Sequence, residues 1–170
     1  INVTVTSTVS KIGYAPGEAR TQITVNPRKL DINVTAEPST VISEETSVIT
    51  VLVIHKGTPI ADNATVRLYF YINGNISETS GYTYNGTAAF VFTAPYASVP
   101  TIVNITAIAS TDGYMSAEIQ TQILVVPKIL GINVTTVPNA ISSEETAAIT
   151  ILVTYNEQPV TDANVTVLSD

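Results

Sequence analysis

The 170-residue chain has 7 Lys and Arg against 14 Asp and Glu, a net charge of −7, and 45% of its residues are hydrophobic while only 12% are charged. The acidic balance argues against the basic surface that nucleic-acid binding requires, and the absence of Cys excludes disulfide scaffolds, thiol catalysis and cysteine zinc sites. The 21 Val and 20 Ile exclude a disordered segment, and 26 Thr and 13 Ser fill polar positions that charges usually occupy.

The apolar segments are short. The longest, 123–134, is interrupted by Pro127 and Lys128 and falls below the roughly 18 residues that a membrane helix needs. We therefore expect no membrane span in this segment. The chain begins at Ile1 without an initiator Met or a signal sequence, so we expect a processed form or part of a longer protein.

Residues 1–27 are related to a later part of the chain. An ungapped comparison of residues 13–30 with residues 113–130 finds 9 identities in 18 positions. Such internal repetition is the sequence signature of a repeat protein. Residues 1–27 are therefore predicted to be the C-terminal strands of an incomplete unit.

Residues 28–127 are predicted to form one complete unit. Apolar and polar residues alternate, and turn signals recur every 8–12 residues or so, as in a sandwich or barrel. The first strands are expected at Asp31–Glu37 and Thr46–His55. The second of these directs three side chains inward: Ile49, Val51 and Val53.

The rest of this unit follows the same alternation. A third strand places four apolar side chains on one face: Val66, Leu68, Phe70 and Ile72. It leads into Asn73-Gly74, a strong hairpin signal. Further strands are expected at Thr87–Thr93, Ile102–Ser110 and Ala117–Val126. The strand at 102–110 should direct Val103, Ile105, Ala107 and Ala109 inward. Seven short strands in about 100 residues indicate an immunoglobulin-like sandwich.

The C-terminal part repeats the beginning of the complete unit. Residues 131–168 match residues 31–68 at 16 of 38 ungapped positions, so residues 128–170 are predicted to be the N-terminal strands of a following incomplete unit. The predicted fold is all-β, a tandem of immunoglobulin-like β-sandwich repeats with a period of 100 residues. Because two or three strands alone are marginal in water, each incomplete unit needs further chain or strand donation from a neighbouring molecule.

Three strings in the complete unit resemble a known family: GTPIADNATVRLYF, YNGTAAFVFTAP and NITAIASTDGY. They are similar to the bacterial and archaeal Ig-like repeats of cell-surface proteins, of the invasin, surface-layer (S-layer) and filament types. The chain departs from antibody-type domains, which have a Cys pair and a core Trp, and it has Val103 where a tyrosine often begins the strand. The resemblance implies the architecture more firmly than any activity.

The most informative motif is Asn-x-Ser/Thr, the acceptor sequence (sequon) for N-linked glycans. Eight of the twelve asparagines begin one, whereas the 39 Ser and Thr among 170 residues would give about three by chance. The predicted sites are Asn2, Asn33, Asn63, Asn75, Asn85, Asn104, Asn133 and Asn164. Glycans would hydrate a surface that is poor in charge. The alternative is that Asn and Thr only decorate exposed strand faces.

Other polar residues point to no chemistry. Glu44-Glu45 and the repeated pair Glu144-Glu145 lack the oxygen-rich loop that calcium needs, so they are interpreted as solvated turns. His55 has no partner motif for a catalytic triad and is interpreted as a surface residue. We predict no catalytic, cofactor-binding or metal-binding residue, no cofactor and no enzyme activity.

Four tyrosines form a possible interface. Tyr69 and Tyr71 alternate with inward-facing residues and should lie on the outer face of their strand, with Tyr82 and Tyr84 beside them. An exposed aromatic patch of this kind can bind protein or sugar. The alternative is ordinary cross-strand packing.

The junctions between units are short. Residues 27–30 and 127–130 contain proline and apolar residues, whereas flexible linkers are rich in Gly and Ser. We expect Leu30 and Leu130, which follow Pro27 and Pro127, to pack against a domain end. This predicts a stiff rod of units stacked end to end.

The sequence therefore favours a non-enzymatic structural repeat of a glycosylated, extracellular cell-surface protein, in a filament, stalk or surface layer. An archaeal source would fit both the glycans and the resemblance. The expected partners are neighbouring repeats of the same protein and covalent N-glycans. The alternatives are an adhesin module that binds a receptor or glycan through its outward tyrosines and loops, and a spacer domain of a secreted enzyme.

Overall fold

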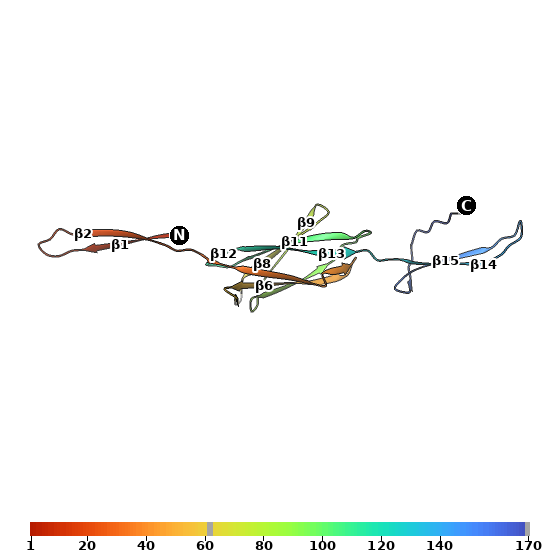
Figure 1. The fold of residues 1–170 in the computed structure, drawn as a ribbon, viewed down its shortest axis with the longest axis horizontal. Coiled ribbons are helices and arrows are strands. Elements are labelled where there is room, and N and C mark those ends of the chain that lie inside the picture. Colours follow the sequence, from red (N-terminus) through yellow and green to blue (C-terminus); the bar gives the residue numbers. More distant parts are fainter. Residues whose placement is uncertain (61–62, 169–170) are drawn as a thin grey trace.

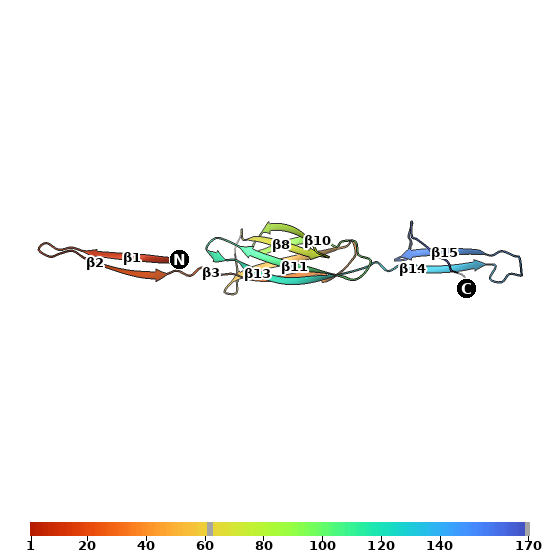
Figure 2. The same cartoon turned by 90° about the horizontal axis from the view of Figure 1, so that it is seen from above.

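The computed structural model describes residues 1–60 and 63–168. Ala61-Asp62, which belong to the segment GTPIADNATVRLYF that resembles the Ig-like repeats, lie outside the described residues. The described chain is all-β, as predicted, and forms an N-terminal hairpin, a central sandwich and a group of C-terminal strands that follow one another along the long axis (Figures 1 and 2). No helix among the described residues is long and apolar enough to cross a membrane.

The central sandwich contains eleven of the described strands. They are β3 (Arg28–Lys29), β4 (Asp31–Glu37), β5 (Thr40–Ile42), β6 (Thr46–His55), β7 (Thr58–Pro59), β8 (Thr65–Ile72), β9 (Asn75–Tyr82), β10 (Thr87–Thr93), β11 (Thr101–Ser110), β12 (Tyr114–Met115) and β13 (Ala117–Val126). One sheet has the order β10-β6-β4, with β7 paired to β6, and the other has the order β5-β13-β11-β8-β9. The two remaining strands, β3 and β12, pair with each other in a short parallel ladder. The predicted bounds of four strands agree with those observed, and the strand expected to begin at Ile102 begins one residue earlier.

The first long strand is divided between the two sheets. β4 pairs with β6 in an antiparallel ladder, whereas β5 pairs with β13 in a parallel one. The crossing lies at Pro38 and Ser39, where the Pro38 carbonyl accepts a hydrogen bond of 2.8 Å from Ser47 Oγ and the Ser39 carbonyl accepts one of 3.0 Å from the Leu124 amide. The division ties the two sheets together along one side of the core.

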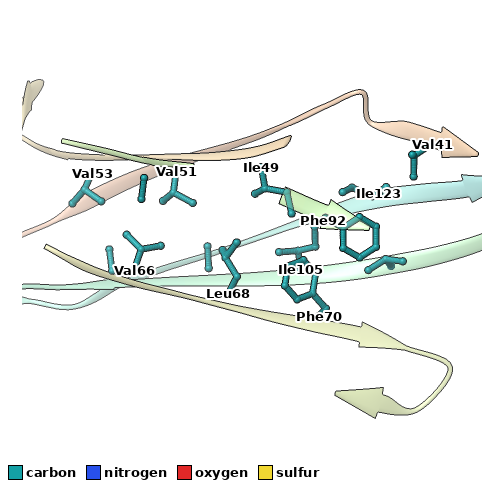
Figure 3. Packing of buried hydrophobic residues seen from close by; sticks show 14 of the residues in the cluster. Val41, Ile49, Val51, Val53, Val66, Leu68, Phe70, Phe92, Ile105 and Ile123 are labelled. Atoms are coloured by element: carbon teal, nitrogen blue, oxygen red, sulfur yellow. The ribbon is translucent and has the colours of Figure 1, made fainter. Parts of the chain in front are cut away.

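The core lies between the two sheets. Ile49, Val51 and Val53 of β6 are fully buried, as the alternation predicts, and they face β8 and β11 of the opposite sheet (Figure 3). Phe70 and Phe92 stack across the core with ring centroids 5.2 Å apart. Complete burial of such an aliphatic or aromatic side chain contributes about 1.5–3 kcal/mol to the stability of the fold. The core therefore stabilises the two sheets against each other, and with them the outer faces that carry the polar side chains.

The flanking parts repeat pairings of the central sandwich. They contain β1 (Asn2–Val9), β2 (Gly17–Thr24), β14 (Gly131–Val137), β15 (Ala148–Tyr155) and β16 (Gln158–Pro159). The pair Val3↔Ile23 recurs as Val103↔Ile123, and the pair Ile32↔Val53 recurs as Ile132↔Val153. Each pairing recurs with both residue numbers shifted by 100.

Candidate functional site

The eight sequon asparagines all have exposed side chains. Asn33 and Asn75 lie on β4 and β9, which are edge strands of the two sheets. Asn63 and Asn85 occupy turns with positive φ values of 73° and 50°, a left-handed conformation that asparagine adopts more readily than most residues. The fold therefore leaves every predicted acceptor residue exposed to solvent.

Asn104 has a different environment from the edge and turn sites. It lies on β11, which is hydrogen-bonded to β8 on one side and to β13 on the other. In these ladders Asn104 is opposite Tyr71 and Gln122. Thr106, the hydroxyl residue of its sequon, is only 8% exposed and lies opposite Tyr69 and Gln120. The asparagine is thus accessible while the threonine is covered.

A hollow of about 750 Å³ lies on the outer face of the sheet around Asn104. Its lining comes from β8, β11 and β13: Tyr69, Tyr71, Asn104, Thr106, Ile108, Glu118 and Gln120. Its volume is within the range of about 300–1,000 Å³ that is typical of small-ligand sites. Aromatic rings on β8, with a carboxylate and an amide opposite them on β13, suit a ligand that has an apolar face and polar edges.

Tyr69 and Tyr71 lie on the outer face of β8, as the alternation predicts. Leu68, which precedes Tyr69, and Phe70, which lies between the two tyrosines, are buried on the inner face. The expected position of Tyr82 and Tyr84 beside them is wrong. Tyr82 is opposite Thr65, four residues along the ladder from Tyr69, and Tyr84 forms an isolated bridge with Thr87. The strand that follows Asn73-Gly74 is long enough to carry Tyr82 to the far end of β8, so the four tyrosines form two separate groups.

Lys128 connects the central sandwich with the C-terminal strands. Its Nζ atom donates a hydrogen bond of 2.7 Å to Glu44 Oε2 and lies 5.8 Å from the centroid of the Tyr155 ring. The hydrogen bond to Glu44 is the main cause that raises the pKa of Lys128 above its ordinary value of 10.5. Glu44 lies in a left-handed turn with φ of 69° and is the member of the Glu44-Glu45 pair that contacts Lys128. The sequence analysis did not identify this contact.

The first junction has a related arrangement. Arg28 donates a hydrogen bond of 3.2 Å to the Tyr114 hydroxyl and lies 5.5 Å from the centroid of that ring. Tyr114 contacts His55 edge to face, with centroids 5.2 Å apart, and His55 Nδ1 is 2.7 Å from the Lys29 carbonyl oxygen. Arg28 and Lys128 are 100 residues apart, as are His55 and Tyr155. Arg28 and Tyr114 both lie in the central sandwich, on β3 and β12, so their contact is within one part. The hydrogen bond from Lys128 to Glu44, by contrast, joins two parts.

The two junction leucines differ in burial. Leu30, after Pro27, is 1% exposed and belongs to the central core, whereas Leu130, after Pro127, is 49% exposed. A shared sequence pattern does not give them equal burial, because the strands around Leu130 have no opposing sheet in the described chain.

The polar side chains of the described residues form no group of three or more His, Cys, Asp or Glu that could hold a metal ion. The features that could have a functional role are therefore the exposed sequon asparagines, the hollow beside Asn104, and the cation–ring contacts at the junctions. Contacts between a cation and an aromatic ring contribute about 0.5–1 kcal/mol at exposed sites, so these contacts help to position the basic side chains beside the junctions.

No protein-family model matches the chain, and a comparison with curated proteins finds no match. Several solved structures are distantly similar. A superoxide reductase (neelaredoxin) from Ignicoccus hospitalis has 17% identity and a TM-score of 0.44, over 55% of this chain and 79% of that one. A CARDB domain from Pyrococcus furiosus, in complex with di-metal ions, has 14% identity and a TM-score of 0.37, over 62% and 99%. The sporulation control protein Spo0M from Bacillus subtilis has 15% identity and a TM-score of 0.33, over 60% and 50%.

Proposed function

We propose that the chain is part of a tandem array of immunoglobulin-like β-sandwich repeats, with a period of 100 residues, in a glycosylated extracellular surface protein. The proposed units are an incomplete one at 1–27, a complete one at 28–127 and a second incomplete one at 128–170. The observation that carries this proposal is the recurrence of strand pairings 100 residues apart, as in Val3↔Ile23 and Val103↔Ile123. Its role is structural and non-enzymatic, in a filament, stalk or surface layer.

The mechanism is mechanical. Each sandwich resists extension through its ladders and its core. The second junction orients one unit on the next through the hydrogen bond from Lys128 to Glu44. The proposed partners are neighbouring repeats of the same protein, supplied by the same chain or by strand donation between molecules. Either source would cover the apolar faces that the flanking strands leave exposed.

Glycans contribute a second function, which is protection of sheet edges. An unpaired edge strand is a template for unwanted pairing, and proteins commonly block such edges. Asn33 and Asn75 place predicted glycans on two edge strands, β4 and β9. A bulky hydrated group at these positions would prevent edge-to-edge association of adjacent rods without using charge.

The experiment that tests this proposal is electron cryo-microscopy of native material, combined with mass spectrometry of its glycopeptides. We expect a row of β-sandwiches at a constant spacing with protruding density at sequon asparagines. Unmodified asparagines at all eight sites would contradict the glycosylated-surface proposal, and isolated single domains would contradict the array.

An adhesin module is the second candidate. It is supported by Tyr82 and Tyr84, which are 71% and 74% exposed. The test is adhesion of cells or beads coated with the chain and with its Tyr82→Ala, Tyr84→Ala double variant. Equal adhesion would exclude a role for these rings, whereas a loss of adhesion with unchanged stability would support it.

A further inference from the structure

The hollow on the outer face of β8, β11 and β13 contains its own attachment point for a ligand. Asn104, a sequon asparagine, is part of its lining together with Tyr69 and Tyr71. The combination of a sequon and two rings in one hollow suggests an occupant that is covalently bound.

We propose that the first sugar of an N-glycan on Asn104 lies in this hollow and stacks on Tyr71, with Tyr69 extending the platform. This inference rests on the proposed glycosylation. It adds a defined binding position for one sugar in the hollow, which we call the seat, and a contribution of that sugar to the stability of the fold. The seat makes the Asn104 glycan part of the folded sheet, unlike the glycans on edges and turns.

The ladder geometry places the sugar within reach of the ring. Asn104 and Tyr71 are directly opposite each other on neighbouring strands, and such pairs have Cα atoms about 4.5–5.5 Å apart. A sugar on the Asn104 side-chain nitrogen therefore begins beside the phenol ring of Tyr71, which is 39% exposed. The C–H groups on one face of a pyranose ring can cover that exposed aromatic surface, and removing this apolar surface from water is favourable in free energy.

The polar part of the hollow suits the other side of the sugar. Glu118 and Gln120 on β13 line the hollow opposite the tyrosines, and they offer a carboxylate and an amide to the hydroxyl groups. Glu118 carries a hydrogen-bond acceptor, and Gln120 carries both a donor and an acceptor. A hydroxylated ring with one apolar face therefore finds partners for both of its surfaces.

Among the sequon asparagines in the described ladders, Asn104 is distinguished by its cross-strand partner. Five sequon asparagines lie in described ladders, and their cross-strand partners on β-strands are Thr24 for Asn2, Leu52 for Asn33, Ile72 for Asn75, Tyr71 and Gln122 for Asn104, and Leu152 for Asn133. Among these, Asn104 alone is opposite an aromatic residue. The residue 100 positions earlier is Thr4, so the sequon is not part of the repeated pattern.

The test is a double-mutant cycle on the whole chain, secreted from eukaryotic cells that attach high-mannose glycans. An endoglycosidase trims each glycan to a single N-acetylglucosamine, which is the probe. Thermal midpoints are measured for the trimmed chain and for its Asn104→Gln, Tyr71→Ala and doubly substituted variants. We expect the sugar at Asn104 to raise the midpoint by about 4 °C when Tyr71 is present, and by much less in the Tyr71→Ala background.

Three controls identify the seat. Asn75→Gln should have the same small effect with Tyr71 and with Tyr71→Ala, because Asn75 lies outside the hollow. Tyr71→Phe should keep the stabilisation because it keeps the ring. Tyr82→Ala should leave it unchanged, because Tyr82 is far along the ladder.

Mass spectrometry of the Asn104 peptide separates the two proposals. If Asn104 carries the sugar and its effect on the midpoint is equal with Tyr71 and with Tyr71→Ala, the seat is wrong and glycosylation stands. If Asn104 is unmodified while the other sequons are modified, the seat is also wrong and the glycosylated-surface proposal stands without this site. Modification of none of the sequons would overturn both.

Discussion

The pair β11–β13 in the central sandwich and the hairpin β1–β2 are paired in the same register but differ in burial. Val103 and Ile123 are 0% exposed, whereas Val3 and Ile23, the residues 100 positions earlier, are 45% and 54% exposed. Both pairs face each other in the same way in their ladders. What differs is that the sheet containing β4 and β6 covers one pair and no strand of the described chain covers the other.

This comparison separates strand register from burial, two properties that a sequence pattern alone does not distinguish. The register is a local property, set by alternation and by the connecting turn, where Gly13 and Gly113 both adopt positive φ, of 84° and 77°. Burial depends on another sheet that comes from distant parts of the chain. A β-hairpin alone is at most marginally stable in water. The apolar face of β1–β2 can therefore stabilise the hairpin only when another sheet covers it.

The largest effect on the free energy of unfolding is expected from truncating the equivalent isoleucines Ile123 and Ile23, which are 100 positions apart. Ile123→Ala should lower the free energy of unfolding of the central sandwich by about 2–5 kcal/mol, because it leaves a cavity between the sheets. Ile23→Ala changes the same residue type at the equivalent ladder position and should cost less than about 0.5 kcal/mol. Chemical denaturation monitored by circular dichroism measures both. Equal losses would show that the hairpin is covered in solution.

A fused chain should abolish this difference. Placing a copy of residues 28–100 directly before Ile1 recreates the 100-residue spacing and supplies the hairpin with equivalents of β4, β6 and β10. In this fusion, Ile23→Ala should cost about 2–5 kcal/mol, like Ile123→Ala, because its side chain would be buried. If Ile23→Ala remained neutral in a fusion that adds a second cooperative unfolding transition, the proposed equivalence of the two hairpins would be wrong.

The same comparison predicts when a sugar can be attached. Thr4→Asn creates, in β1, a sequon equivalent to that of Asn104, and its Thr6 is exposed whereas Thr106 is 8% exposed. An oligosaccharyltransferase given folded, unglycosylated protein should therefore modify the Thr4→Asn variant at residue 4 but should leave Asn104 unmodified. Peptide mass spectrometry measures the occupancy of both. Modification of Asn104 in fully folded protein would show that β11 opens readily.

The smallest effect is expected at the second junction. Lys128→Ala removes the hydrogen bond to Glu44 and the contact with Tyr155, so the orientation of the two parts should vary more widely while the thermal midpoint stays unchanged. Since the chain has no Cys, spin labels at Ser110→Cys and Ser142→Cys report the distance distribution. Lys11→Ala, at the tip of the N-terminal hairpin, is the control and should have no effect.

The pH dependence of this junction follows from the raised pKa of Lys128. A lysine whose pKa is raised by its partner contributes fully below its ordinary value of 10.5 and loses that contribution as the pH rises through the raised value. The distance distribution should therefore stay narrow from neutral pH to about pH 10 and broaden above it. A distribution equally narrow at high pH would exclude the Lys128–Glu44 pair as the cause.

Most of the central strands could be predicted from the sequence, because alternation on a half-buried face is a local signal. Ile49, Val51 and Val53 are buried where the pattern placed them. The division of the first strand into β4 and β5, and the length of β9, could not be predicted, since strand partners come from distant residues. That length separates Tyr82 from Tyr69. The Lys128–Glu44 contact likewise joins residues 84 positions apart.

The sequence by itself determined the all-β class, the spacing of 100 residues between related segments and the identity of the sequons, because these depend only on residue type, order and periodicity. Only the tertiary structure decided which of two equivalent apolar faces is buried, and which of the five sequon asparagines in the described ladders lies opposite an aromatic residue. Both outcomes depend on which strands come together across long stretches of chain. Ile23 and Ile123 have the same local pattern, but only Ile123 has a second sheet to exclude water from it.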